Sequence, residues 1–234
     1  RFNWMTPFFI SHYDPATLYV GANALFKSTT RGDDWTRISE DLTTNPGPEK
    51  TGNVPFGTIT SVSESHLSRG LLYAGTDDGN VHVTRDEGST WTRINTALPT
   101  RWVSRVVASR HQQATVYVSL TGYRQDDFST YLYKSTDYGT TWSSIAGNLP
   151  AESVNVIHED PLVESVLYVG TDLGVYASTT AGTVWQSLCN HLPTTPVHDL
   201  AVHPRARELI IGTHGRSIYV LDVSKIQDSA RPSP

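Results

Sequence analysis

The 234-residue chain has a single cysteine, Cys189, so it can form no internal disulfide. No apolar run reaches the ~18 residues that a membrane-spanning helix needs, which predicts no membrane span. A basic excess is also lacking: 23 acidic residues outnumber 18 basic ones, giving a net charge of −5 at pH 7. A nucleic-acid partner is therefore not expected. The length suits one large all-β domain or two small ones.

Signatures of known catalytic sites are missing as well. The chain has no Gly-x-Ser-x-Gly elbow and no His-Glu-x-x-His helix, and its nine histidines are scattered singly. We therefore predict no metal and no cofactor. No signal peptide is visible, and the chain begins with Arg1 rather than Met. We expect a processed or truncated N-terminus and a longer parent chain with further blades or domains.

One octapeptide occurs four times, at residues 28–35, 84–91, 135–142 and 178–185, and we call these copies boxes 1 to 4. Box 3 reads Ser-Thr-Asp-Tyr-Gly-Thr-Thr-Trp, and box 2 keeps its Asp, Gly and Trp. Boxes 1 and 4 keep the Gly and Trp but have Thr in place of the Asp. The repeated positions are Gly32, Trp35, Asp86, Gly88, Trp91, Asp137, Gly139, Trp142, Gly182 and Trp185.

Each box lies within a repeat of four short predicted strands. β-Branched and aromatic residues fill the strands, while Gly, Asp and Asn fill the turns. No sustained helical period appears. Four-stranded repeats of ~40–50 residues are typical of propeller blades. We predict an all-β propeller of about five blades over residues 1–225, with repeats at about 5–42, 56–99, 102–150, 153–193 and 196–223, followed by a linker at 226–234.

The fifth repeat lacks a box and a fourth strand. Arg1–Met5 forms a surplus strand-like segment that would complete this blade if five blades close a ring. The alternative is that the chain is a segment of a larger propeller. Both possibilities remain open from the sequence.

The octapeptide closely resembles the Asp box, Ser-x-Asp-x-Gly-x-Thr-Trp. It is found in bacterial neuraminidases, in sortilin-like propellers, in xyloglucanases and in photosystem-assembly propellers. Residues 72–91 and 197–222 also resemble the C-terminal propeller part of large secreted bacterial proteins with a glycosyl-hydrolase-like label. This resemblance implies a structural role for the boxes and a bacterial protein that is secreted or in the cell envelope. The Arg-Ile-Pro motif of neuraminidases has no match here.

Strand alternation places the boxes at one end of each blade, and the loops between the second and third strands at the other. Two long insertions, 42–55 and 123–129, fall at this second end, where we expect ligand contacts. The candidate ligand-binding residues are Trp102, Arg105, Tyr123, Arg124, Asp126, Asp127, His214 and Arg216. Asp126 and Asp127 are also the catalytic candidates, because a glycosidase needs two carboxylates ~5–10 Å apart.

The sequence favours a non-catalytic binding or scaffolding module. Its ligand would be a carbohydrate or a protein, bound at the end of the blades opposite the boxes. One alternative is a glycoside hydrolase of the xyloglucanase or neuraminidase-like type. Another is an assembly or sorting factor that binds polypeptide. Function depends on the sites that a fold carries, so the fold alone does not choose among these classes.

Overall fold

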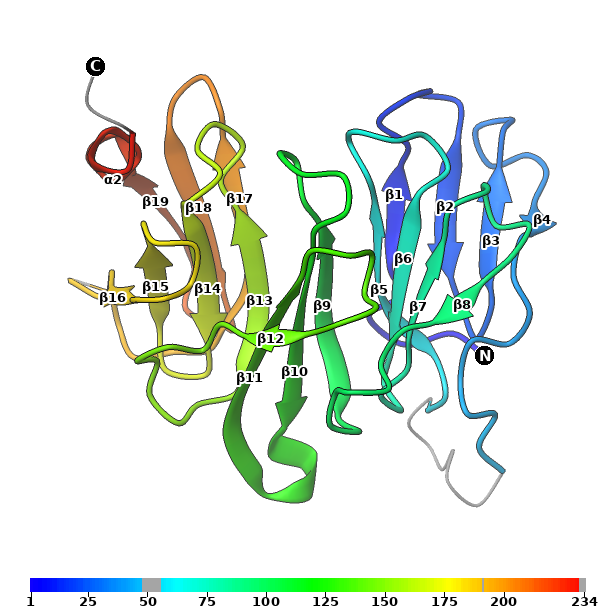
Figure 1. The fold of residues 1–234 in the computed structure, drawn as a ribbon, viewed down its shortest axis with the longest axis horizontal. Helices are drawn as coiled ribbons and strands as arrows, with labels where there is room; N and C mark the ends of the chain where they lie inside the picture. The colour runs from blue at the N-terminus through cyan, green and yellow to red at the C-terminus, as the bar shows by residue number, and fades with distance from the viewer. Residues whose placement is uncertain (48–55, 191, 232–234) are drawn as a thin grey trace. The chain divides into compact units, whose positions relative to one another are not determined.

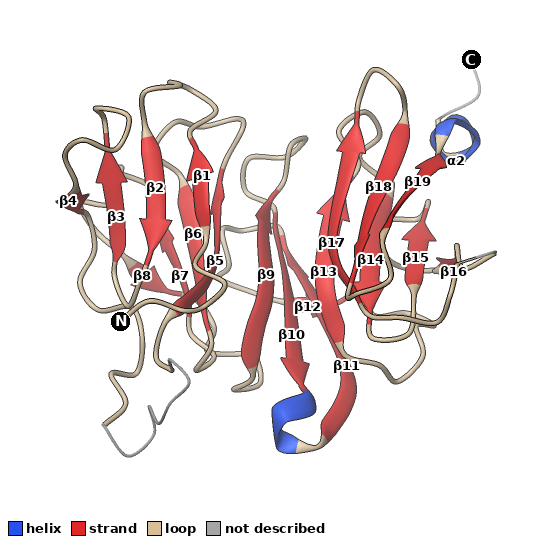
Figure 2. Cartoon of the chain, turned by 180° about the vertical axis from the view of Figure 1, so that it is seen from behind, coloured by secondary structure: helices blue, strands red, loops and turns tan. Residues whose placement is uncertain are grey.

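The computed structural model describes residues 1–47, 56–190 and 192–231. Within this part of the chain, five antiparallel sheets follow one another, each built from consecutive strands (Figures 1 and 2). We number them blades 1 to 5. Blades 1 to 4 have four strands each and blade 5 has three. The predicted all-β organisation in about five blades is confirmed, including the missing fourth strand of the last blade.

Each blade runs from its first to its last strand in chain order. The strands are β1 (Phe8–Ile10), β2 (Leu18–Gly21), β3 (Leu25–Ser28) and β4 (Thr36–Arg37) in blade 1; β5 (Ile59–Glu64), β6 (Leu72–Thr76), β7 (Val81–Thr84) and β8 (Thr92–Arg93) in blade 2; β9 (Trp102–Ala108), β10 (Val116–Gly122), β11 (Asp127–Ser135) and β12 (Ser143–Ser144) in blade 3; β13 (Val154–Glu159), β14 (Leu167–Thr171), β15 (Val175–Ser178) and β16 (Gln186–Ser187) in blade 4; and β17 (Val197–His203), β18 (Glu208–Thr213) and β19 (Ile218–Asp222) in blade 5.

Contacts divide the chain into two compact units. The first consists of Arg1–Tyr117 with Ser135–Trp142, and the second of Val118–Lys134 with Ser143–Pro234. Each unit has its own apolar core, in which second strands are buried on both faces. The core of the first unit includes Tyr19, Leu25, Ile59 and Leu72, and that of the second includes Val156, Tyr168, Leu209 and Ile211.

A glycine near the end of the second strand lets neighbouring blades approach closely. A Cβ at Gly21 would lie 3.0 Å from the nearest atom of Ile59 in blade 2. A Cβ at Gly170 would lie 2.6 Å from Val197 in blade 5. Larger side chains would overpack these junctions, which explains why this strand ends in a small residue.

The boxes are tight turns held by repeated hydrogen bonds. The first residue of each box accepts a bond from the glycine N–H, as in Gly139 N to Ser135 Oγ at 2.8 Å. Gly139 has φ +89°, and the preceding Tyr138 has φ +60°. A glycine tolerates this backbone conformation with no steric penalty, which accounts for its presence in all four copies. Each box therefore forms a tight turn that its own hydrogen bonds stabilise.

Each of boxes 2 to 4 also attaches its blade to the preceding one. The indole N–H groups donate to backbone carbonyls: Trp91 to Ile38 at 2.8 Å, Trp142 to Ile94 at 2.7 Å and Trp185 to Ile145 at 2.9 Å. In every case the acceptor is the isoleucine three residues after the previous box tryptophan. The Trp-x-x-Ile spacing thus reflects a hydrogen bond between neighbouring blades, in which the isoleucine of one blade accepts from the box tryptophan of the next. The strand after box 3 begins at Ser143, one residue later than the tryptophan.

Both ends of the described chain contact the blades. Arg1 and Asn3 bind blades 1 and 2, where Arg1 Nε donates to Gly57 O at 3.1 Å and Asn3 Nδ2 to Thr58 Oγ1 at 3.0 Å. The described part of the chain gives blade 5 no strand from Arg1–Met5. The expected linker also begins as structure, because Ser224–Ser229 form helix α2. Its Gln227 is fully buried and donates to Asp160 at 2.7 Å, which fixes the helix to blade 4.

Candidate functional site

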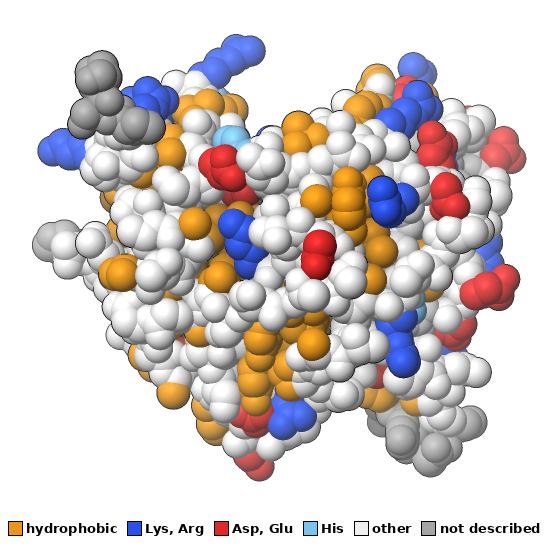
Figure 3. Space-filling model, in the orientation of Figure 1, with side chains coloured by type: hydrophobic (Ala, Val, Ile, Leu, Met, Phe, Trp, Pro, Cys, Tyr) orange, Lys and Arg blue, Asp and Glu red, His pale blue; other side chains and the backbone are white. Residues whose placement is uncertain are grey.

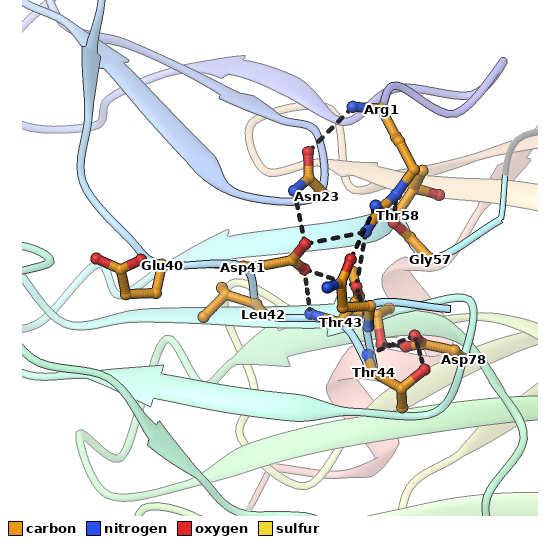
Figure 4. Close-up of polar contacts among 12 residues, drawn as sticks. Arg1, Asn23, Glu40, Asp41, Leu42, Thr43, Thr44, Gly57, Thr58 and Asp78 are labelled. Carbon is orange, nitrogen blue, oxygen red and sulfur yellow. Dashed lines mark hydrogen bonds and ion pairs between the residues drawn. The ribbon is translucent and has the colours of Figure 1, made fainter. Parts of the chain in front are cut away.

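We call the end of a blade opposite its box the loop end. Antiparallel pairing places the turn between second and third strands there, together with the link to the next blade. In the first compact unit, the loop ends of blades 1 and 2 hold a polar cluster of buried and half-buried carboxylates (Figure 4). Residues 48–55 of the 42–55 insertion lie outside the described part of the chain.

Asp77 is 3% exposed and its oxygens accept hydrogen bonds from the start of blade 2. Gly57 N and Thr58 N each donate to Oδ1 at 2.9 Å, and Thr58 Oγ1 donates to Oδ2 at 2.5 Å. Burial raises the pKa of Asp77 above its usual range, although the hydrogen bonds from Thr58 and Gly57 act in the opposite direction. The carboxylate thus fixes the point where the inter-blade link becomes a strand.

Asp78 and Asp41 hold the link that leaves blade 1. Asp78 Oδ2 accepts from Thr44 N at 2.7 Å and Thr44 Oγ1 at 2.8 Å. Asp41 Oδ2 accepts from Arg1 Nη2 at 2.9 Å and from Asn23 Nδ2 at 2.8 Å (Figure 4). The link is therefore tied to turns of both blades that it joins.

In the second compact unit, carboxylates of blade 4 likewise accept hydrogen bonds at the link into the blade. Glu152 accepts a hydrogen bond from Thr171 Oγ1 at 2.5 Å and one from the Tyr176 hydroxyl at 3.4 Å. Asp172 accepts from Asn155 Nδ2 at 2.9 Å. These contacts place the link into blade 4 against its own second and third strands. Burial, and then the negative charge of Glu152, raise the pKa of Tyr176 to about 12.

The hydrogen bonds of these carboxylates can be compared with what a glycosidase requires. A glycosidase needs one carboxyl that donates a proton and a second that attacks or activates water, on either side of the scissile bond. The carboxylates of Asp41, Asp77, Asp78 and Glu152 instead accept hydrogen bonds that hold turns and links in place. Their arrangement supports a structural role.

The 123–129 insertion is an extension of the sheet of blade 3. Strands β10 and β11 continue to a tip formed by the short helix η1 (Tyr123–Gln125) (Figures 1 and 2). Asp126 ends this helix with φ +54°, and its N–H donates to Tyr123 O at 3.1 Å. We call residues 122–131 the blade 3 hairpin. A regular hairpin presents its side chains more rigidly than an open loop.

The tip of the hairpin is aromatic and charged. Tyr123 is 44% exposed, Phe128 is 55% exposed, and the Arg124 guanidinium lies 4.6 Å from the centroid of the Tyr123 ring. Asp127 accepts from Ser129 N at 3.0 Å and from the Tyr131 hydroxyl at 2.7 Å, which stabilises the turn. Figure 3 shows acidic and basic side chains together at this lower end, below a group of hydrophobic ones. Phe128 was not among the predicted site residues, although an isolated aromatic in a polar insertion is a signal that the sequence shows.

The remaining predicted residues are not part of the hairpin. Trp102 is buried in β9 and Arg105 is partly buried in the same strand, both in the first compact unit. His214 and Arg216 are exposed in the turn between β18 and β19, where His214 N donates to Pro196 O at 2.8 Å. The structure therefore brings together Tyr123, Arg124, Asp126 and Asp127 at the hairpin tip.

No helix among the described residues is long and apolar enough to cross a membrane. Among the same residues, no group of three or more His, Cys, Asp or Glu side chains is arranged to hold a metal ion.

Comparison with solved structures defines the class of fold. The chain superposes on the glycoside hydrolase family 74 xyloglucanase from Xanthomonas campestris with a TM-score of 0.70 and 13% identity, over 98% of this chain and 37% of that one. It superposes on the β-propeller domain of Cps50 (Swd1) from Myceliophteria thermophila with a TM-score of 0.67 and 14% identity, over 97% and 67%. The five sheets are thus the blades of a β-propeller.

A third match is the structure of YCF48 bound to D1 peptide, with a TM-score of 0.60 and 14% identity, over 94% of this chain and 70% of that one. At these identities the likeness concerns the fold alone. The chain spans about a third of the length of the family 74 structures that it matches. No protein-family model and no curated protein sequence matches it.

Proposed function

We propose that this propeller is a non-catalytic binding or scaffolding module of a secreted or cell-envelope bacterial protein, and that the blade 3 hairpin contacts a protein ligand. The observation that carries the proposal is the projecting tip, where Tyr123, Phe128 and Arg124 are exposed on a regular hairpin. Aromatic residues and arginine are enriched at the centres of protein interfaces. The compartment rests on the resemblance to large secreted bacterial proteins.

The base of the hairpin supports a binding role because it is anchored. Thr130 Oγ1 donates to Pro150 O at 2.5 Å and accepts from Glu152 N at 3.1 Å. The Asp127 bonds hold the strand between this anchor and the tip. A preorganised contact surface loses less conformational entropy on binding than a flexible loop does.

A peptide-display selection tests this proposal. Peptides that bind the wild-type chain should bind the Tyr123→Ala/Phe128→Ala variant at least tenfold more weakly, since truncation of a hot-spot residue costs about 2 kcal/mol or more and about 1.4 kcal/mol is a factor of ten in affinity. Trp4→Ala is the matched control, because Trp4 is another strongly exposed aromatic, outside the hairpin. Equal affinities for the wild type and the hairpin variant would contradict the proposal. A glycan array probed with the same proteins tests the alternative: glycan binding lost only in the hairpin variant would make the ligand a carbohydrate.

A glycoside hydrolase is the second candidate, supported by the superposition on family 74 enzymes. Its carboxylates would have to include Asp126 or Asp127, or lie in other parts of a longer chain. Hydrolysis of a polysaccharide panel by this chain, abolished by Asp126→Ala or Asp127→Ala, would favour the enzyme. Turnover that survives both changes would remove these two residues as catalytic candidates.

A further inference from the structure

A cavity of about 480 Å³ lies between blades 1 and 2, within the first compact unit. One wall is the start of the link that leaves β4, with Arg37, Glu40 and Asp41. The other wall belongs to blade 2, with His82 from β7 and Trp91 from box 2. Its size falls in the range of about 300–1,000 Å³ that small-molecule sites occupy.

The cavity lies at a position where blade 2 departs from the other four blades. In the third strands, His82 is equivalent to Phe26, Tyr133, Tyr176 and Tyr219 by the pairing of these strands with their neighbours. An aromatic ring is therefore present in four blades and an imidazole in one. The imidazole is smaller than the phenyl or phenol ring of the other blades, so it leaves space beside the link.

Hydrogen bonds within and between blades 1 and 2 hold the walls of the cavity in place. Asp41 is fixed by Arg1 and Asn23, as Figure 4 shows, while the Glu40 side chain points away from that cluster. Leu42 O accepts from Asn80 Nδ2 at 3.0 Å, and the Trp91 indole N–H donates to Ile38 O at 2.8 Å. Both sides of the cavity are thus built by contacts that the two blades make with each other, and the site is preorganised.

His82 has hydrogen-bonding capacity that the described residues do not use. Its Nδ1 is buried and has no hydrogen-bond partner among them. A buried polar atom that lacks a partner costs about 1–3 kcal/mol. Burial, and then the positive charge of Arg93, lower the pKa of His82 to about 4, while Asp78 acts in the opposite direction. The imidazole is therefore neutral at pH 7.

The charges at the cavity are paired. Arg37 Nη2 lies 3.4 Å from Glu40 Oε2, and Arg1 lies 2.9 Å from Asp41. With the imidazole neutral, the lining offers donors and acceptors without a net charge, beside the half-buried indole of Trp91. Sugar hydroxyls both donate and accept hydrogen bonds, and the C–H groups of a sugar ring suit an aromatic surface. We propose that this cavity binds one unit of a neutral saccharide, whose ring packs against the Trp91 indole beside His82.

Binding can be measured by titrating the 15N-labelled chain with cellotetraose, xylotetraose, mannotetraose and maltotetraose. The expected result is saturable shifts of the Trp91 indole and the His82 imidazole with at least one of these four. His82→Tyr, which restores the residue type of blades 3, 4 and 5, should weaken that binding at least tenfold without lowering Tm. His203→Tyr is the matched control, because it makes the same change at an exposed position in the other compact unit.

Three outcomes would overturn the proposal. One is the absence of shifts at Trp91 and His82 with all four saccharides. Another is a His82→Tyr variant that binds as tightly as the wild type. The third is binding of glucose 6-phosphate at this cavity in preference to the neutral sugars. The Tyr123→Ala/Phe128→Ala variant should keep saccharide binding, so this result is separable from the test of the hairpin.

Discussion

Asp77 shows what a buried carboxylate does in this fold. It accepts three hydrogen bonds from Gly57 and Thr58, so it joins the second-third strand turn of blade 2 to the first strand of the same blade. Backbone N–H groups at that point would otherwise be buried without a partner, at a cost of about 1–3 kcal/mol each. In the sequence Asp77 resembles a reactive carboxylate, but in the structure its oxygens accept hydrogen bonds that hold the surrounding backbone in place.

We therefore predict that Asp77→Ala lowers the free energy of unfolding by about 2–4 kcal/mol, because it leaves buried donors unsatisfied. Urea unfolding followed by circular dichroism measures the change. Asp126→Asn is the matched control, since Asp126 is exposed at the hairpin tip and asparagine also tolerates its φ of +54°, and this variant should stay within about 0.5 kcal/mol of the wild type. Equal losses for the two variants would contradict the structural role of Asp77.

Two histidines give the chain a predicted pH dependence. The His66 ring stacks on His12 with centroids 3.6 Å apart. Burial, then Arg110 and His12, lower the pKa of His66 to about 4, and the pKa of His82 is also about 4. Their unfolded pKa is near 6.5, so the unfolded chain binds more protons between these values. The free energy of unfolding should fall as the pH decreases from about 6.5 to about 4, by ~1–2 kcal/mol per histidine after solvent screening.

Urea unfolding at pH 7.5, 5.5 and 4.5 checks this dependence. In the His66→Gln/His82→Gln variant the slope over this window should be reduced. Asp137 acts in a separate window, because hydrogen bonds from Thr141 and Ser135 lower its pKa to about 2. Its contribution is present above its unfolded pKa and is lost only as the pH falls towards 2. If the His66→Gln/His82→Gln variant kept the full pH dependence of its unfolding free energy between pH 6.5 and 4, groups other than these two histidines would cause that dependence.

The boxes show how one element tolerates a changed residue. In box 3, Asp137 Oδ1 accepts from Thr141 N at 2.8 Å, and Oδ2 accepts from Thr141 Oγ1 at 2.7 Å. In box 4, Thr180 Oγ1 accepts from Val184 N at 2.9 Å, so the hydroxyl replaces one of the two bonds. The threonines of boxes 1 and 4 make the weaker version of the turn that the sequence predicts, and Thr30 does so through Asp34 N at 2.9 Å.

Thr180→Asp combined with Val184→Thr should restore both bonds in box 4. One added charge-assisted hydrogen bond is worth about 1 kcal/mol at a solvent-exposed turn, so Tm should rise by ~2–4 °C. Val184→Thr alone is the control and should give little change, because the Thr180 hydroxyl is too short to reach a second donor. A double variant no more stable than this control would mean that the second bond does not stabilise the turn.

Local patterns explain which elements could be predicted. The strands and box turns follow from residue types within a few positions, so the blades could be read from the sequence. The bond from the Trp91 indole to Ile38 spans 53 residues, and it needs the packed blades to be seen. Helix α2 was missed because its fixing contact is the long-range bond from Gln227 to Asp160. The His82 substitution is visible once third strands are aligned, but the cavity beside it depends on how the link packs.

At the scale of the whole molecule, blade 5 differs from the blades inside the chain. In β19, Ile218 is 68% exposed and Val220 is 60% exposed. Their equivalents in blade 2, Val81 and Val83, are buried. Strand β19 pairs only with β18 in the described part of the chain, so it also presents an unpaired edge. Apolar side chains beside an open strand edge favour association with other chains.

The isolated chain should therefore self-associate through this surface at high concentration. Ile218→Lys/Val220→Lys should shift the population towards monomer, because charged side chains on an edge strand oppose pairing and burial. Size-exclusion chromatography with light scattering over a hundredfold concentration range measures the effect. Leu173→Lys is the matched control, since Leu173 is a comparably exposed apolar residue in the β14–β15 turn of blade 4. The prediction is contradicted if the double lysine variant associates as strongly as the wild type while Leu173→Lys abolishes association. The chains would then associate through blade 4 and not through the edge of β19.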